Sequence, residues 1–531
     1  MIPKLLKRPT VVTLTGVSLG ILSVILTLLA YMPGMEAGFY LDDKSSIVWV
    51  SALHWEAWSM DGVISVLTGS QLTTRPLPNI SFALNHLVGG LEPYGYHLTN
   101  LVIHLATGLS LWWVAMLMAR DGEVCSNSKN KIILCSLAVT TIYLVHPLNI
   151  QAVTYVVQRM TSMAALFVLL SFGCYLLARR NRGTVAVLGF SASALCWLLA
   201  MASKEIAIQL PLVLLLYEAC FHRDFWKVRL GRLSIATVFS ARGIFVGAIL
   251  ILVSTYILKT YNPESHFHWY EQFPGRDFSG VERLLTQSRV QFFYLTLVLW
   301  ASPSRLNIEH DFIVSQSLWQ PWTTILAASG WIIALVVLLY FAKAKPRLAF
   351  PLLAYMTFHL LESGPINLEM VFEHRMYLPM AFLALFLNSV LLSDFVNWKV
   401  AVLVVYMLAL PLAYATYERN KVWSNELEFL RDSAEKSPNN FRSWYNLGSR
   451  LGESGYFAEA EEVLQKALKL KPKKARPNHA WAHNQLGNVY KLTGRLTEAI
   501  EQYQLALKAE PTLRIARRNL LRTELLKATG K

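Results

Sequence analysis

Long apolar segments recur through the first 417 residues, and they constrain the fold more than any other feature of the chain. A helix that crosses a bilayer needs about 20 mostly apolar residues, and in lipid a helix satisfies its own backbone hydrogen bonds. We therefore predict an all-α membrane domain over residues 1–417 with about eleven crossings. The predicted crossings lie near 11–31, 98–118, 132–147, 161–178, 184–201, 206–220, 236–258, 323–342, 348–361, 376–392 and 398–416.

The composition separates this region from the remainder of the chain. Only 16% of the residues are charged and 54% are hydrophobic, whereas soluble proteins carry roughly 25% charged residues. Residues 418–531 have the composition of an ordinary soluble domain. The five cysteines lie in or beside the predicted crossings, so neither a disulfide framework nor a cysteine metal site is expected.

Basic residues are concentrated in five short loops between predicted crossings. The loops are 120–131, 179–183, 221–232, 343–347 and 393–399. Lys and Arg favour the cytoplasmic side of a membrane, so we place these loops in the cytoplasm with the N-terminus. The net charge of +15 follows from this bias, and no nucleic-acid partner is expected. A further apolar segment, 286–302, fits this orientation only if it does not cross, and the tail then lies on the outer face.

Dense polar motifs occur in the loops on the opposite side from the basic loops. A charged residue near the end of a span is costly and is usually functional. Because these motifs all lie on one side, they predict a site at the outer membrane surface. For each single residue, the alternative is a solvated loop residue or a helix cap. The motifs are 40–43, 74–77, 146–147, 158–159, 203–205, 308–311 and 373–379.

The tail carries a repeated pattern of small and large residues that is typical of tetratricopeptide repeats. Gly448 and Gly487 occupy equivalent positions in two helix pairs. In each pair, small residues permit close approach of the helices, and a proline ends the unit. The two glycines are 39 positions apart, whereas the usual period is about 34. We therefore expect an insertion around 473–479 and a preceding half-unit over 423–438.

The motifs together resemble the transmembrane-and-tetratricopeptide-repeat protein O-mannosyltransferases, which have the GT-C glycosyltransferase fold. The order of the motifs carries the resemblance, which covers most of the chain. The residues concerned are 40–43, 75–77, Asn85, 95–100, His104, 146–153, Arg159, 204–205, 373–379 and 418–423. The resemblance implies transfer of one sugar from a polyprenyl-phosphate donor at the outer membrane face, with a Ser or Thr hydroxyl of a protein as the acceptor.

The small number of repeats and the compact membrane part point to a bacterial relative. We accordingly expect a multi-pass protein of the inner membrane, with the repeats in the periplasm, where they hold a protein acceptor beside the membrane lipid. The alternative function is a non-enzymatic membrane scaffold, in which the repeats assemble envelope machinery.

Asp42 and Asp43 are the candidate catalytic residues, because the acceptor hydroxyl needs a base. Adjacent residues of an extended segment point in opposite directions, so one carboxylate can accept the proton while the other orients the acceptor or a loop. The resemblance favours Asp42 as the base. The alternative is that the pair caps a helix over 44–50.

Cationic side chains are needed for the leaving phosphate, and the planar fork of Arg suits it. The candidates are Arg375 and Lys204, followed by Arg75 and Arg159; for Arg159 the alternative is snorkelling to the membrane interface. The candidate substrate-binding residues are His146, Glu205, Glu309, His310, Asp311, Glu373, His374 and Tyr377. Residues 309–311 also have the side chains of a divalent-metal site, but a sugar-hydroxyl contact is the favoured interpretation, and no cofactor is expected.

Overall fold

The computed structural model describes residues 11–70, 73–121, 128–222, 273, 276–470 and 477–529. Within these ranges the regular structure consists of helices and includes no β-strand, which confirms the all-α prediction. The predicted crossing at 236–258 lies outside the described residues, as do most of the basic loop 221–232 and most of the expected insertion at 473–479.

The helices of the membrane bundle follow the predicted apolar segments. Proline occupies the first turn of α4 and of α14, where its missing N–H has no intrahelical partner to lose. The bundle helices are α1 (Val11–Tyr31), α4 (Pro93–Met118), α5 (Lys129–Val145), α7 (Arg159–Arg180), α8 (Gly183–Met201), α9 (Leu210–Phe221), α13 (Thr323–Ala342), α14 (Pro346–His359), α15 (Tyr377–Leu391) and α16 (Trp398–Trp423). Shorter or peripheral helices are α2 (Met60–Gly69), α3 (Pro76–Gly89), α6 (Ile150–Val153) and α12 (Gly280–Leu299).

Six helices of the described residues are long and apolar enough to cross a membrane, or seven if α5 and α6 form one bent span. The six are built on α1, α4, α7, α8, α13 and α16. Helices α9, α14 and α15 are shorter, with 12, 14 and 15 residues. The protein is therefore a multi-pass membrane protein, and the total of about eleven crossings stays a prediction.

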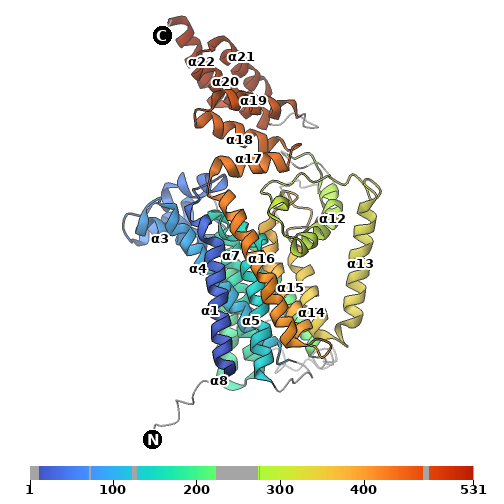
Figure 1. Ribbon diagram of the computed structural model, residues 1–531. Coiled ribbons are helices and arrows are strands. Elements are labelled where there is room, and N and C mark those ends of the chain that lie inside the picture. The colour runs from blue at the N-terminus through green and yellow to red at the C-terminus, as the bar shows by residue number, and fades with distance from the viewer. Residues whose placement is uncertain are drawn as a thin grey trace, which may run out of the picture.

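Different loops lie at the two ends of the bundle. At one end, hereafter the basic end, four of the predicted cytoplasmic loops meet, including 393–399 through the Ser393 carbonyl. Arg180 pairs with Asp121 at 2.7 Å, and Nε of Arg347 donates to the Asp121 carbonyl at 2.6 Å. The Lys131 ammonium donates to the Leu392 carbonyl at 2.8 Å. The other end, hereafter the repeat-facing end, carries the polar motifs and is covered by the tail (Figure 1).

Helix α12 contains most of the apolar segment 286–302, and both of its ends contact the repeat-facing end. Near its start, Arg283 donates to the carbonyl of Glu362 at 2.6 Å, just beyond the end of α14. Near its end, the Val298 carbonyl lies 3.0 Å from Nε2 of His146, just beyond the end of α5. Helix α12 thus starts and finishes on one side of the bundle, as the orientation from the basic loops requires.

The tail is a stack of antiparallel helices that stands beyond the repeat-facing end (Figure 1). Its helices are α17 (Glu426–Lys436), α18 (Phe441–Glu453), α19 (Phe457–Lys469), α20 (Pro477–Leu492), α21 (Leu496–Ala509) and α22 (Arg514–Thr529). A Cβ at Gly448 would lie 2.7 Å from Leu464 Cγ, and one at Gly487 would lie 2.6 Å from a ring carbon of Tyr503. Both glycines are therefore required by close helix approach, which is the physical basis of the repeat pattern.

Helix α16 joins the bundle to the repeats without a break. It continues to Trp423, so the predicted domain boundary at 417/418 falls inside a helix. Trp423 is buried against the ring of Phe429 in α17, with centroids 4.3 Å apart. A linker that is helical and packed at its end fixes the repeats against the bundle more firmly than a loop of the same length.

Candidate active site

The acidic pair after α1 divides into one exposed and one buried carboxylate. Leu41, immediately before the pair, has a φ of 46°, and this left-handed residue turns the chain sharply. The Asp42 side chain is 56% exposed, and its backbone N–H donates to the Tyr155 hydroxyl at 2.9 Å. The two side chains therefore occupy different environments although they are adjacent in sequence.

Asp43 is buried, and its side chain hydrogen-bonds to the backbone. Its side chain accepts hydrogen bonds from the backbone N–H of Val157 at 2.7 Å and of Tyr40 at 3.1 Å. Burial raises the pKa of Asp43 to about 8, although the two backbone hydrogen bonds oppose the shift. The helical turn over Lys44–Val48 receives no side-chain cap from Asp43. Asp43 thus ties the segment after α1 to the start of the Val156–Gln158 turn instead of capping a helix.

Asp42 lies at the edge of a cluster of carboxylates that surrounds Arg442 of α18. Nη2 of Arg442 is 4.0 Å from Oδ1 of Asp42, Nε is 3.3 Å from Oε1 of Glu309, and Nη1 is 3.2 Å from Oε1 of Glu369. Burial raises the pKa of Glu309 to about 7, and the Arg442 charge opposes that shift. On the other side, Arg276 also pairs with Glu369.

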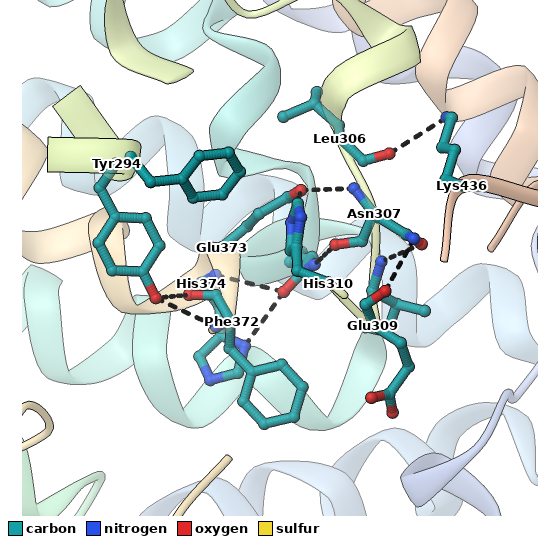
Figure 2. A network of polar contacts seen from close by, with 12 residues as sticks. Tyr294, Leu306, Asn307, Glu309, His310, Phe372, Glu373, His374 and Lys436 are labelled. Carbon is teal, nitrogen blue, oxygen red and sulfur yellow. Dashed lines mark hydrogen bonds and ion pairs between the residues drawn. The ribbon is translucent and has the colours of Figure 1, made fainter. Parts of the chain in front are cut away.

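A second polar network lies beneath this cluster and holds the loop 306–311 (Figure 2). Glu373 accepts from the backbone N–H of Asn307 at 2.6 Å and lies 2.9 Å from Nε2 of His310. The Gln151 amide donates to the Asn307 carbonyl at 2.8 Å, and its oxygen accepts from the His374 backbone at 3.3 Å. Glu373, His310 and His374 thus lie in one network, and their contacts fix the backbone that presents Glu309.

The three residues of the 309–311 motif contact three different partners. Asp311 accepts from the Asn439 side chain of the repeats at 2.8 Å. Glu309, His310 and Asp311 thus turn to Arg442, Glu373 and Asn439 respectively. No group of three His, Cys, Asp or Glu side chains suited to a metal ion occurs among the described residues.

Two predicted substrate-binding residues lie inside the bundle. Nδ1 of His146 accepts from the Leu148 backbone at 3.2 Å and begins the turn after α5. The Tyr377 hydroxyl is 2.7 Å from Nδ1 of His104, and the Tyr377 side chain is fully buried. Both residues therefore shape the helix ends that carry the site, and we do not place them in contact with a substrate.

The predicted cationic residues form a second cluster at the repeat-facing end. Lys204 pairs with Glu362 at 3.1 Å and donates to the Thr161 hydroxyl at 3.0 Å. Arg75 pairs with Glu205 at 2.9 Å. The pKa of His374 is held well below its usual value, first by burial and then by the charges of Lys204, Arg375 and Arg75. Three of the four predicted phosphate ligands therefore act electrostatically on one buried imidazole.

Arg375 links the cationic cluster to the carboxylates. Its Nη1 donates to the carbonyls of Glu369 at 2.8 Å and of Met370 at 3.1 Å. The Glu369 side chain turns the other way, towards Arg442. Arg283 holds the same segment by donating to the carbonyls of Glu362 and Leu368, at 2.6 and 3.1 Å. The loop 362–375 thus contributes to both clusters. Its Glu369 side chain faces Arg442, and Arg375, a few residues later in the sequence, belongs to the cationic cluster.

Arg159 stands apart from the other predicted phosphate ligands. It is fully buried and donates to Asn100, Ser81 and the Tyr96 carbonyl at 2.6, 3.1 and 2.9 Å. Its guanidinium also covers the Phe82 ring, 4.5 Å from the centroid. With these contacts the Arg159 guanidinium joins α3, α4 and α7, and it does not extend to a membrane interface. We therefore leave Arg159 out of the proposed donor site.

Four residues of these clusters were missed by the sequence analysis. Glu362 and Glu369 are charged residues in the loop after α14, and the same argument that selected Glu373 applies to them. Arg283 and Arg442 give no such signal, because Arg283 lies just before the apolar segment 286–302 and Arg442 lies in the soluble tail. Only the packing of the tail on the bundle brings Arg442 to Asp42.

Comparison with known proteins supports both parts of the chain. Residues 440–509 match the family model described as tetratricopeptide repeat. Human protein O-mannosyl-transferase TMTC3 is 22% identical over 91% of this chain and 54% of the relative. Drosophila melanogaster protein O-mannosyl-transferase Tmtc3 is 24% identical over 82% of this chain and 52% of the relative. Xenopus laevis protein O-mannosyl-transferase tmtc2 is 28% identical over 53% of this chain and 33% of the relative.

These matches confirm the resemblance to the transmembrane-and-tetratricopeptide-repeat proteins that the motifs predicted. The aligned region spans about half the length of the two TMTC3-type relatives, with 54% and 52%, and 33% of the frog protein.

Proposed function

We propose that this relative of the transmembrane-and-tetratricopeptide-repeat protein O-mannosyltransferases is a membrane glycosyltransferase of the GT-C type. It transfers a single sugar from a polyprenyl-phosphate donor to a Ser or Thr hydroxyl of a protein at the outer, periplasmic face. One observation carries the proposal: an exposed carboxylate, Asp42, lies at the same end of the bundle as the buried Lys204 and Arg375 and the partly exposed Arg75.

Asp42 takes the role of general base in this mechanism. It is the exposed member of the acidic pair, whereas Asp43 is committed to two backbone hydrogen bonds. The Asp42 carboxylate removes the proton of the acceptor hydroxyl as the hydroxyl oxygen attacks the sugar carbon. A positioned base of this kind contributes about 10²- to 10⁴-fold to the rate.

The cationic cluster takes the leaving group. As the bond from the sugar carbon to the acceptor oxygen forms, the bond from that carbon to the phosphate oxygen breaks, and polyprenyl phosphate departs with the electron pair. Arg375, Lys204 and Arg75 stabilise the negative charge that develops on the phosphate. No oxidant, reductant or cofactor is needed for this step.

The repeats suit an acceptor polypeptide. Helices α18, α20 and α22 contribute to a groove of about 310 Å³ whose lining includes Gln485, Asn488 and Asn519. Side-chain amides both donate and accept hydrogen bonds, as the main chain of an extended peptide requires. The groove stands on the same side of the bundle as Asp42, so one polypeptide can reach from the repeats to the base.

The test is transfer by the full-length chain in lipid vesicles, with polyprenyl-phosphate mannose as donor and a Ser/Thr-rich protein as acceptor. Intact mass should show a hexose increment with the wild type and none with Asp42→Asn. Asp61→Asn, an exposed carboxylate of α2, is the matched control and should transfer normally. Equal transfer by Asp42→Asn and the wild type would remove Asp42 as base. No transfer from any polyprenyl-phosphate sugar would favour the scaffold.

A further inference from the structure

Arg442 is a cation that the repeat domain inserts among the carboxylates of the membrane domain. It is the second residue of α18, and the capping side chain of Asn440 accepts its backbone N–H at 2.9 Å. Residues at the start of a helix are held firmly by such a cap. The guanidinium is therefore projected from a fixed backbone towards the bundle.

Three separate segments of the membrane domain meet at this guanidinium. Asp42 follows α1, Glu309 belongs to the loop 306–311, and Glu369 belongs to the loop 362–375. The Glu309 side chain is only 8% exposed, whereas Arg442 is 39% exposed. Like charges at this separation repel one another, and a cation between them offsets the repulsion. On the side of Asp42, Arg442 thus supplies the positive charge beside these carboxylates. On the other side, Arg276 of the membrane domain pairs with Glu369.

Several contacts besides those of Arg442 dock the repeats on the membrane domain. The Lys436 ammonium donates to the carbonyls of Pro303 and Leu306 at 2.8 and 3.1 Å. The Asn307 amide donates to the Ser437 hydroxyl at 2.9 Å, and Lys44 pairs with Glu426 of α17 at 2.7 Å. These contacts hold the repeats in place without touching Asp42. Among the docking contacts of the described residues, that of Arg442 is the one that reaches the Asp42 carboxylate.

We propose that Arg442 is a positioning residue of the transferase, so that the repeat domain completes the active site instead of only recruiting the acceptor. The inference rests on the proposed function, with Asp42 as base. Arg442 holds the Asp42 and Glu309 carboxylates in the arrangement in which Asp42 receives the acceptor proton. It does not contact the transferred sugar, because its three nitrogen atoms face the carboxylates.

The charge of Arg442 should be visible in the pH dependence of transfer. The charged groups that act on the Glu309 carboxyl are Arg442, Glu369, Asp42 and Arg276. A neighbouring cation favours the ionised form of a carboxylate. Arg442 opposes the rise in the pKa of Glu309 that burial causes, so removing Arg442 raises that pKa further, and a limb of kcat/KM that follows Glu309 moves to higher pH.

The experiment compares Arg442→Gln, Arg442→Met and Arg442→Lys in the full-length chain. We expect the two neutral variants to lose about 10- to 100-fold in kcat, with the donor KM changed by less than about twofold. In both neutral variants the limb that follows Glu309 should move to higher pH, because the cation that lowers the Glu309 pKa is absent. Arg442→Lys should keep the wild-type limb and recover most of kcat, because it retains the charge. Arg431→Gln is the control, since Arg431 pairs with Glu459 on the exposed side of the repeats at 2.6 Å.

The outcomes separate this inference from the proposed function. If the wild type transfers sugar, Asp42→Asn does not, and Arg442→Gln or Arg442→Met has the wild-type kcat and pH profile, the inference is overturned and the function stands. Equal losses in Arg442→Lys and the neutral variants, without a shifted limb, would overturn it as well, because they indicate a merely structural role. If the wild type transfers nothing, both fall together.

Discussion

Similar ion pairs lie at the two ends of the membrane bundle. At the basic end, Arg179 pairs with Glu218 at 2.5 Å and Arg180 pairs with Asp121 at 2.7 Å. At the repeat-facing end, Lys204 pairs with Glu362 at 3.1 Å and Arg75 with Glu205 at 2.9 Å. Burial and pairing alone therefore do not distinguish a structural cluster from a reactive one.

The difference lies in what surrounds each pair. The basic-end pairs tie neighbouring helices and loops together, and Tyr175 adds a 2.7 Å hydrogen bond to Glu218. The repeat-facing pairs surround a buried histidine whose pKa is lowered by burial and by their charges, and an exposed carboxylate lies at the same end. We infer that an exposed carboxylate at the same end as buried cations, rather than ion pairs or positive charge alone, marks the proposed donor site.

The largest effect that tests this comparison comes from Lys204→Gln. Removing one member of a buried pair typically costs about 3–5 kcal/mol, so Lys204→Gln and Arg179→Gln should both lower the thermal unfolding temperature. Transfer per folded molecule should fall more than about 100-fold in Lys204→Gln, because the leaving phosphate loses a cation. It should stay within about twofold of the wild type in Arg179→Gln. Similar losses of activity per folded molecule in the two variants would break the distinction between the ends.

Arg75→Gln sharpens the comparison within the repeat-facing end. Arg75 is more exposed than Lys204, with 23% against 7% of the side chain accessible. We expect a loss of about 10-fold in kcat/KM for the donor, with an unfolding temperature close to that of the wild type. Glu205→Gln, which keeps the arginine, should retain most of the activity. An unchanged donor kcat/KM in Arg75→Gln would exclude Arg75 from the phosphate site.

The division between Asp42 and Asp43 predicts a pH effect on stability. The folded-state pKa of Asp43 is about 8, above the unfolded value of about 3.9. Between these values the folded state keeps a proton that the unfolded state releases, so stability falls as pH rises through this range. The unfolding temperature of the wild type should therefore drop relative to that of Asp43→Asn from pH 5 to pH 8. A difference that is constant or of opposite sign would contradict the assignment of Asp43 as a buried structural carboxylate.

The smallest effect is expected at the basic end. Arg180 and Asp121 form a partly exposed pair, with 26% and 15% of the side chains accessible. Exposed pairs contribute about 0–1 kcal/mol, so Arg180→Gln should change the unfolding temperature by less than about 3 °C and leave transfer unchanged. A clear loss of transfer in this variant would show that the basic end takes part in the reaction.

The patterns that could be predicted from sequence are those with a local cause. Apolar runs specify the bundle helices, and the small residues at Gly448 and Gly487 specify the helix pairs of the repeats. Lys204, Arg375 and Arg75 could be selected because a charge at the end of an apolar helix is costly. Local patterns did not reveal that α16 continues through the expected boundary at 417/418, since its last turns are polar outside and packed inside.

Contacts between distant segments could not be predicted in this way. The different environments of Asp42 and Asp43 depend on the left-handed backbone of Leu41 and on the approach of Val157. Arg442 reaches the carboxylates only because the repeats dock on the loop 306–311. Arg159 resembles a phosphate ligand in sequence, yet buried partners from α3 and α4 occupy its guanidinium.

The most direct test of the account measures donor binding and single-turnover transfer separately in Asp42→Asn. The account predicts that polyprenyl-phosphate mannose binds this variant with a Kd within about threefold of the wild type, because the cationic cluster is intact. The rate of sugar transfer from the bound donor should fall by about 10²- to 10⁴-fold, because the acceptor proton has no base. Loss of donor binding with an unchanged transfer rate from the donor that does bind would contradict the central claim that Asp42 serves the acceptor and the cationic cluster serves the phosphate.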